Sequence, residues 1–359
     1  GAKTVAVSPI DVARDVPARI PPEDVAKATK VGLLTLANEA ARSEGVAISQ
    51  VSARYGDSRR RILVANSDGL LAEDDQIRTL FSVSCVATGD TGLQTGREST
   101  GRTVGFELFE ETDVEDMGRR AAQRAITKLA ARPAPSGAIP VVVGPGGGGV
   151  LFHEACGHGL EADLIAKGAS VFANRIGDEV ASPLVTLIDD GTMAGEWGHF
   201  AIDDEGRPAA HNVLIQDGVL KQFVHNTYSA RRAGTVSTGN ATRGGFAGTP
   251  GVGCLAMSLV PGTRSQAELI SDVDDGLLVQ SVQGLHSGVN PISGDFSTGA
   301  AGLLITNGDV GAPVREFTIA STLQRMLLDI VEIGGDLDWL PMRSSGMSLV
   351  IRDITLSGT

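Results

Sequence analysis

Two histidines and a glutamate lie within six residues in the stretch His-Glu-Ala-Cys-Gly-His, residues 153–158. Neutral imidazole nitrogens are suitable ligands for a divalent ion such as zinc, and a site with one open position can also bind water. A neighbouring carboxylate can take a proton from that water and later pass it to a leaving amine. The pattern predicts metal-assisted hydrolysis, with His153 and His158 as zinc ligands and Glu154 as general base.

The spacing of the two histidines predicts a local distortion of the helix that carries them. The common metalloprotease pattern places its histidines four residues apart, on one helical face. His153 and His158 are five apart, which separates them by roughly 140° around an ideal α-helix. A π-bulge, in which residues five apart line up, would bring them together, and so would a frayed helix. Gly157 and Gly159 favour either distortion.

A glycine-rich run precedes the motif. Residues 139–143 are typical of a buried strand, and residues 144–149 formally satisfy the G-x-G-x-x-G pattern of dinucleotide-binding proteins. That alternative requires alternating strands and helices and an acidic residue about 20 residues on, whereas short strands and turns follow here. We therefore interpret the run as a flexible hinge. Cys156 could serve as a thiolate nucleophile beside His158, but a small buried apolar role is favoured.

Together these segments resemble the TldD/PmbA metallopeptidase family. The resemblance rests on the glycine run, the His-Glu-x-x-x-His motif followed by Gly-Leu-Glu, and the later Ile-Asp-Asp-Glu-Gly at residues 202–206, and it extends over residues 9–358. It implies a zinc peptidase that acts on peptides or small unfolded segments inside a closed dimer chamber. In that reading His153 and His158 are ligands and Glu154 is the base.

The resemblance is mixed along the chain. Up to Asp204 the sequence is similar to the catalytic TldD-like subunit, whereas residues 225–243 and 284–308 are closer to the PmbA-like subunit, which usually lacks the metal motif. The alternative function is therefore a non-catalytic or weakly metal-binding partner in a TldD/PmbA-type heterodimer. A homodimer and a heterodimer with a PmbA-like subunit both remain open.

The third zinc ligand of the family is a cysteine near the C-terminus, and no cysteine occupies that region here. Cys254 and His286 are the substitutes that the sequence offers. The catalytic members also carry a further N-terminal segment, so the chain is expected to be shortened at that end. A shortened N-terminus would affect closure of the dimer chamber.

Several polar residues near the motif are candidates for supporting roles. Glu161 or Asp163 could accept the outer N–H of a ligand histidine and fix its tautomer, or form an exposed acidic helix end. We interpret the acidic turn at residues 202–206 as ordinary hairpin chemistry. The other histidines that we considered are predicted to be surface or packing residues: His199, His211 and His225.

Composition limits the classes of function. The formal charge of −13 disfavours direct binding to nucleic acid. No apolar run reaches membrane-spanning length. Three cysteines without paired spacing argue against a disulfide framework and indicate a reducing compartment, so a cytoplasmic protein is expected. With 359 residues the chain is long enough for two domains.

The elements that must position the motif follow from periodicity and turn signals. We expect an α+β fold in two domains, residues 1–132 and 133–359, separated by a Pro-containing linker at residues 131–137. The first domain is expected to be an α/β layer. The second should carry the metal-motif helix at its start, followed by a mostly antiparallel, β-rich part. The predicted elements are helices at residues 21–42, 113–131, 265–276 and 321–332 and strands at 47–55, 61–66, 78–88 and 139–143.

Overall fold

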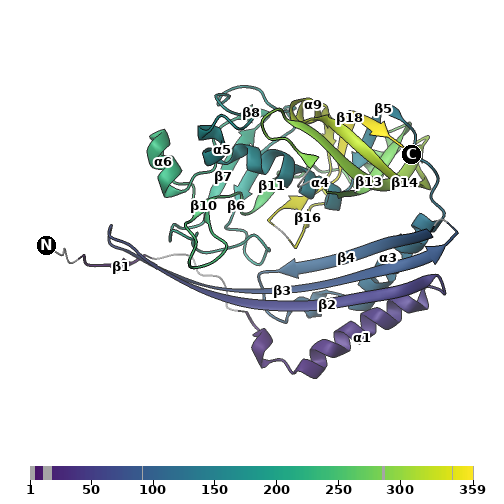
Figure 1. Ribbon diagram of the computed structural model, residues 1–359, viewed down its shortest axis with the longest axis horizontal. Helices are drawn as coiled ribbons and strands as arrows, with labels where there is room; N and C mark the ends of the chain where they lie inside the picture. Colours follow the sequence, from purple (N-terminus) through teal and green to yellow (C-terminus); the bar gives the residue numbers. More distant parts are fainter. Residues whose placement is uncertain (1–4, 11–17, 91, 285–287, 342, 359) are drawn as a thin grey trace.

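The computed structural model describes residues 5–10, 18–90, 92–284, 288–341 and 343–358. The chain forms an N-terminal layer of strands and helices and a larger β-rich C-terminal part, which lie one above the other in Figure 1. Each part has its own cluster of buried apolar side chains. The predicted α+β fold with a β-rich second half is confirmed.

Two long antiparallel strands dominate the N-terminal layer. β2 pairs with β3 over nearly its whole length, while β4 and the short β1 pair with the other side of β3. We predicted separate strands at residues 47–55 and 61–66, but they form one strand because pairing with β3 continues through Gly56. The elements of this layer are β1 (Ser8–Pro9), α1 (Lys27–Ser43), β2 (Ile48–Ala65), β3 (Leu70–Gly89), β4 (Gly92–Arg102), α2 (Leu108–Glu111) and α3 (Val114–Leu129), after a 3-10 turn at Pro22–Asp24.

The helices α1 and α3 pack against this sheet, and Figure 1 shows α1 on the side away from the C-terminal part. The spacing of apolar residues in α3 predicts that Met117 and Ala121 face the core, and both are buried. The spacing in α1 predicts a buried face that includes Val31, which is wrong because Val31 is 49% exposed whereas Ala37 and Ala41 are fully buried. Small side chains face inward there because they let α1 approach its neighbours closely.

A six-stranded sheet forms the frame of the C-terminal part. Its order is β14-β13-β12-β5-β18-β15, with β12 and β5 parallel and the other neighbours antiparallel. The sheet also closes on itself, because β14 pairs with β18. These strands are β5 (Gly137–Val143), β12 (Asp275–Gln283), β13 (Asp295–Thr306), β14 (Asp309–Thr322), β15 (Ile330–Ile333) and β18 (Leu349–Ser357). β5, which leads into the metal motif, therefore lies between β12 and β18, two strands that come much later in the chain.

A smaller antiparallel sheet, in the order β11-β6-β7-β8, lies beside the frame. Its turn at Asp217-Gly218 and the β13–β14 turn at Asn307-Gly308 have positive φ at both residues, as predicted for two-residue hairpins. The other elements are β6 (Leu187–Asp190), β7 (His211–Gln216), β8 (Val219–Leu220), α6 (Thr227–Ala233), β9 (Ala241–Thr242), β10 (Gly251–Val252), β11 (Met257–Leu259), α7 (Gln266–Ser271), α9 (Leu323–Leu328), β16 (Asp338–Trp339) and β17 (Ser345–Gly346). In the described residues, no helix has the length and apolar character needed to span a membrane.

Candidate metal site

The glycine run before the motif is a buried helix. It forms α4 (Pro145–Phe152), which follows β5 directly. A side chain on Gly148 or Gly149 would collide with the C-terminal segment, because a Cβ on Gly149 would lie 2.8 Å from the carbonyl oxygen of Ser345. In return, a Cβ on Gly346 of that segment would lie 1.9 Å from the carbonyl oxygen of Pro145 in α4. The hinge interpretation is therefore wrong, because the glycines serve close backbone packing against β17.

The metal motif continues α4 as a π-helix over His153–Gly157, followed by a 3-10 turn at His158–Leu160. The predicted distortion is thus confirmed. A π-helix aligns residues five apart, and the rings of His153 and His158 have centroids 5.4 Å apart. The opposite side of the motif is fixed in the main core by Leu151 and Cys156, both fully buried.

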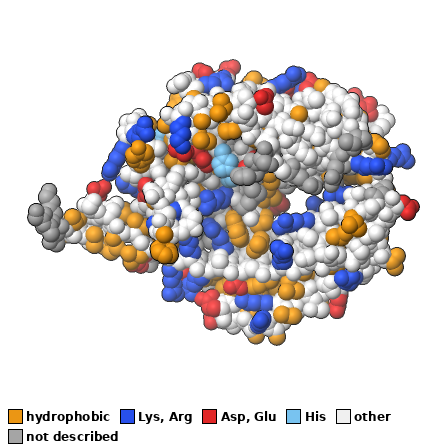
Figure 2. Space-filling view, viewed as in Figure 1, with side chains coloured by type: hydrophobic (Ala, Val, Ile, Leu, Met, Phe, Trp, Pro, Cys, Tyr) orange, Lys and Arg blue, Asp and Glu red, His pale blue; other side chains and the backbone are white. Residues whose placement is uncertain are grey.

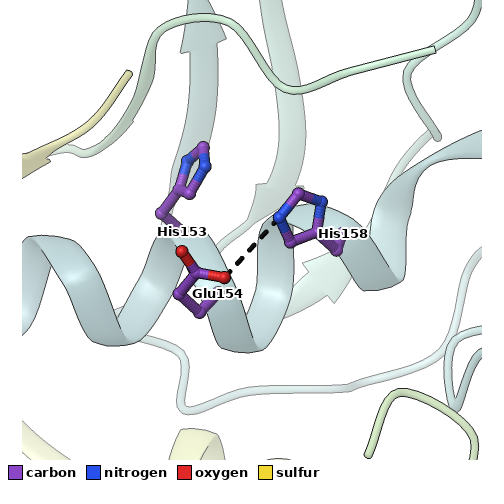
Figure 3. A group of neighbouring side chains, drawn as sticks. All are labelled: His153, Glu154 and His158. Atoms are coloured by element: carbon purple, nitrogen blue, oxygen red, sulfur yellow. Dashed lines mark ion pairs between the residues drawn. The ribbon is translucent and has the colours of Figure 1, made fainter. Parts of the chain in front are cut away.

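Figure 3 shows His153, Glu154 and His158 side by side along this distorted helix. One potential ligand atom from each residue lies within 4.8 Å of those of the other two. Among the described residues, this is the only group of three or more histidine, cysteine, aspartate or glutamate side chains with such geometry. The structure therefore brings together all three residues that the sequence singled out.

His153 has the state that a metal ligand requires. Burial and the nearby His158 lower the pKa of His153 to about 4, so its imidazole is neutral at physiological pH. Its Nδ1 atom is buried and has no hydrogen-bond partner in the described part of the chain. An unpartnered buried nitrogen is costly unless something binds it. A zinc ion, which prefers imidazole nitrogen, fits this donor.

His158 is held by a neighbouring carboxylate. Its Nδ1 lies 3.0 Å from Oε1 of Glu161, while its Nε2 lies 3.6 Å from Oε2 of Glu154, the contact drawn in Figure 3. The hydrogen bond to Glu161 is the main reason why the pKa of His158 is raised. Such a carboxylate fixes the tautomer and leaves the other ring nitrogen for a metal. Of the two acidic candidates, Glu161 contacts the imidazole of His158. Asp163 instead forms an ion pair with Lys167, with its Oδ2 atom 3.6 Å from Nζ.

Removing the outer carboxylate should weaken the site without destroying it. We expect Glu161→Gln to lower zinc affinity about 10- to 100-fold, because the hydrogen bond that orients His158 loses its charged partner. Competition with a chromogenic chelator measures this affinity. Asp163→Asn is the matched control and should leave the affinity nearly unchanged. Equal effects of the two substitutions would contradict a specific role for Glu161.

Cys254, one of the two substitutes for the third ligand, is not part of this cluster. The thiol of Cys254 donates to the carbonyl oxygen of Gly157 at 3.2 Å, and burial raises its pKa well above the ordinary value. A buried, protonated thiol is a poor ligand in this state. His286, the second candidate, lies outside the described residues. Cys156 is fully buried with a pKa raised to about 12, which excludes a thiolate nucleophile in this environment.

The remaining histidines and the acidic turn have structural roles. The Nδ1 atom of His211 lies 2.8 Å from Oδ2 of Asp190. His225 is buried, and its Nδ1 atom lies 3.2 Å from Oγ of Ser229. His199 is buried as well. Asp203 accepts backbone hydrogen bonds within its own turn, as expected for hairpin chemistry. None of these histidines joins the metal cluster.

One charged residue near the site was missed in the sequence. Arg343 occupies the C-terminal segment in which we looked for a cysteine ligand. Its backbone carbonyl accepts a hydrogen bond from Met257, and its positive charge contributes to the lowered pKa of His153. Nothing in the local sequence signals this position, because β17 brings the segment to the motif from far along the chain.

Comparisons with known proteins point to one family. The PmbA/TldA metallopeptidase central domain matches residues 20–129, and the C-terminal domain of the same description matches residues 136–358. The chain is 34% identical to a metalloprotease of Methanothermobacter thermautotrophicus over 94% of its own length and 76% of that relative. It is 32% identical to a metalloprotease TldD homologue of Buchnera aphidicola, over 94% of this chain and 74% of the relative.

Solved structures agree on the fold. A protein from Thermotoga maritima, described as a putative modulator of a DNA gyrase, matches with a TM-score of 0.88 and 25% identity. That match covers 99% of this chain and 80% of the other. TldE from Thermococcus kodakarensis matches in fold, with a TM-score of 0.81 and 24% identity over 97% of this chain and 80% of its own.

Proposed function

The chain belongs to the PmbA/TldD metallopeptidase family, and from that premise we propose that it is a zinc-dependent peptidase or amidase. One observation carries the proposal: the π-helix places two imidazoles five residues apart next to each other, with the Glu154 carboxylate between them. The proposed substrates are small or unfolded peptides, whose amide bonds can enter a site at the surface of a rigid helix.

The roles of the side chains follow from their surroundings. His153 and His158 would hold the zinc ion, which when bound would lower the pKa of a water molecule so that it can lose a proton near neutral pH and act as a nucleophile on a carbonyl carbon. Glu154 would take the proton of that water on a carboxylate oxygen and deliver it to the nitrogen of the leaving amine. Glu161 would keep His158 in the tautomer that leaves Nε2 available.

Zinc content tests this assignment directly. The protein supplied with zinc and then dialysed should contain about one zinc per chain, as expected for a catalytic site of this type. His153→Ala and His158→Ala should each lose the metal, because each removes one of the two clustered nitrogens. His211→Ala is the matched control, since His211 is exposed and pairs with Asp190. Elemental analysis gives the answer for all four proteins.

A metal-free parent would refute the peptidase proposal and support the alternative. In that alternative the chain is the non-catalytic subunit of a heterodimer with a second family member. The observation favouring it is that Cys254 stands apart from the two histidines. Size-exclusion chromatography with light scattering, with and without such a second subunit, distinguishes a homodimer from a heterodimer.

We propose a cytoplasmic location. The supporting observation is that the cysteines Cys85, Cys156 and Cys254 are all buried free thiols. A reducing compartment keeps thiols in that form.

A further inference from the structure

A pocket lined by arginines lies between the N-terminal layer and the C-terminal part. Three arginines line it, Arg60, Arg78 and Arg343, together with the two acidic residues Asp203 and Asp204. We call this site the arginine pocket. Figure 2 shows Lys and Arg side chains gathered in the hollow between the two parts, beneath a histidine patch. The pocket thus combines residues from β2, β3 and the segment before β17.

The cations of the arginine pocket exceed its anions. Arg60 forms an ion pair with Asp204. In the part of the chain that the structure describes, neither Arg78 nor Arg343 has a carboxylate within ion-pair distance. Arg78 instead lies over the ring of Trp197, 5.5 Å from its centroid. Burial, followed by the charges of Arg343 and Arg60, lowers the pKa of Arg78 to about 10. The lining therefore holds three guanidinium groups and two carboxylates, an excess of one positive charge, and Asp204 and Asp189 act on Arg343 only from beyond ion-pair distance.

The excess of positive charge is confined to the arginine pocket and is opposite in sign to the net charge of the whole protein. The chain carries a formal charge of −13, so its general field repels anions. Like-charged guanidinium groups held together in a partly desolvated pocket repel one another and gain from an added anion. Planar guanidinium groups match a carboxylate with two parallel hydrogen bonds. The arginine pocket is therefore suited to a carboxylate group.

Arg343 connects the arginine pocket to the metal site. Its guanidinium lines the pocket, and the same residue acts electrostatically on His153 and Glu161. A group bound in the pocket would thus contact Arg343, whose charge reaches the motif that would hold the scissile bond. Peptides offer carboxylates of two kinds, the free C-terminus and the side chains of aspartate and glutamate.

We propose that the arginine pocket binds a substrate carboxylate close to the scissile amide, so that the protein selects acidic peptides or peptide C-termini. The inference rests on the proposed peptidase function, because only a peptidase or amidase has a scissile amide. Binding itself needs no hydrolysis, however, and can be measured separately.

The experiment measures binding of short peptides to the Glu154→Gln protein, which is expected to retain them uncleaved. The probes are acetylated tetra-alanine with a free C-terminal carboxylate, its C-terminal amide, and that amide with one alanine replaced by glutamate. Isothermal titration calorimetry is performed with zinc and without it. We expect at least one carboxylate probe to bind about tenfold or more tightly than the neutral amide, because a charge-assisted guanidinium contact gives at least this factor.

Substitutions of the arginines test whether the preference for carboxylate probes arises in the arginine pocket. Arg343→Gln and Arg78→Gln should each abolish it, whereas Arg343→Lys should keep part of it. The matched control is Arg54→Gln, an exposed arginine outside the pocket. Thermal unfolding checks each variant, and Arg343→Gln carries the test if Arg78→Gln does not fold.

The outcomes separate this inference from the proposed function. Preference for the free acid would identify a C-terminal carboxylate as the ligand, and preference for the glutamate probe an acidic side chain. Equal binding of all three probes, or a preference that survives in Arg343→Gln, would overturn the inference even if the protein binds zinc. Carboxylate preference in a protein that holds no zinc would support the pocket while the peptidase proposal fails.

Discussion

Replacing Glu154 with glutamine should lower kcat/KM for peptide hydrolysis by about 10²- to 10⁴-fold, the contribution typical of a positioned general base. The amide keeps the size of the side chain but cannot accept the proton of the attacking water. Zinc should remain bound, because His153 and His158 are unchanged. The measurement combines initial rates on a peptide substrate with zinc content of the same preparation.

The zinc content decides between two roles for Glu154. Its carboxylate lies close enough to both histidines to be a ligand itself. Loss of zinc together with activity would identify it as a ligand and contradict the role of base. Glu179→Gln is the matched control, because Glu179 is an exposed carboxylate away from the motif. That variant should retain both zinc and full activity.

Gly346→Ala should lower the free energy of unfolding by about 3 kcal/mol, the upper range for an inserted methyl group in a packed core. The added Cβ would lie 1.9 Å from the carbonyl oxygen of Pro145 and 2.5 Å from the amide nitrogen of Gly149. These are backbone atoms, so α4 must shift to make room. Because the shift moves the helix that continues into the metal motif, zinc binding should weaken as well. Urea unfolding measures the first effect.

Gly32→Ala provides the opposite expectation. Gly32 lies within α1, and a Cβ there would meet nothing within 4 Å. Alanine is the better helix former, so the variant should be more stable by about 0.5–1 kcal/mol. A Gly346→Ala protein that unfolds like the parent would show that the contact between α4 and β17 is looser than described.

The metal motif was predictable because its evidence is local. The types of His153, Glu154 and His158 indicate a ligand set, and their spacing is compatible with shared coordination only if the helix is distorted. Both the choice of ligands and the prediction of the distortion use residues that lie within two helical turns of one another. The same holds for the hairpin at Asn307-Gly308, where two adjacent residues determine the turn type.

The glycine run was misread because its reason lies elsewhere in the chain. Glycines next to a proline permit a hinge, and only the carbonyl groups of Ser345 and Pro145 show that they pack instead. Similarly, the buried face of α1 depends on close contact with α3, which favours Ala37 over Val31. Periodicity identifies a helix, but it does not tell which neighbour the helix will meet.

The arginine pocket has no sequence signature. Its guanidinium groups come from β2, β3 and the segment before β17, and only tertiary pairing unites them. From sequence alone, the basic run at residues 59–61 is more typical of a solvated strand edge than of a DNA contact. That interpretation fits Arg59, which is paired with Asp75, but not Arg60, which reaches Asp204 in the pocket. Residues of one run thus diverge because strand neighbours point to opposite faces.

The docking of α4 against β17 has a consequence for the protein's biogenesis. The strand that leads into the metal motif, β5, pairs with β18, and α4 rests on the backbone of β17. A ribosome-bound chain that still lacks residues 345–357 therefore cannot hold the motif in its final position. On the proposed function, hydrolytic competence would arise only after residues 345–357 have been made.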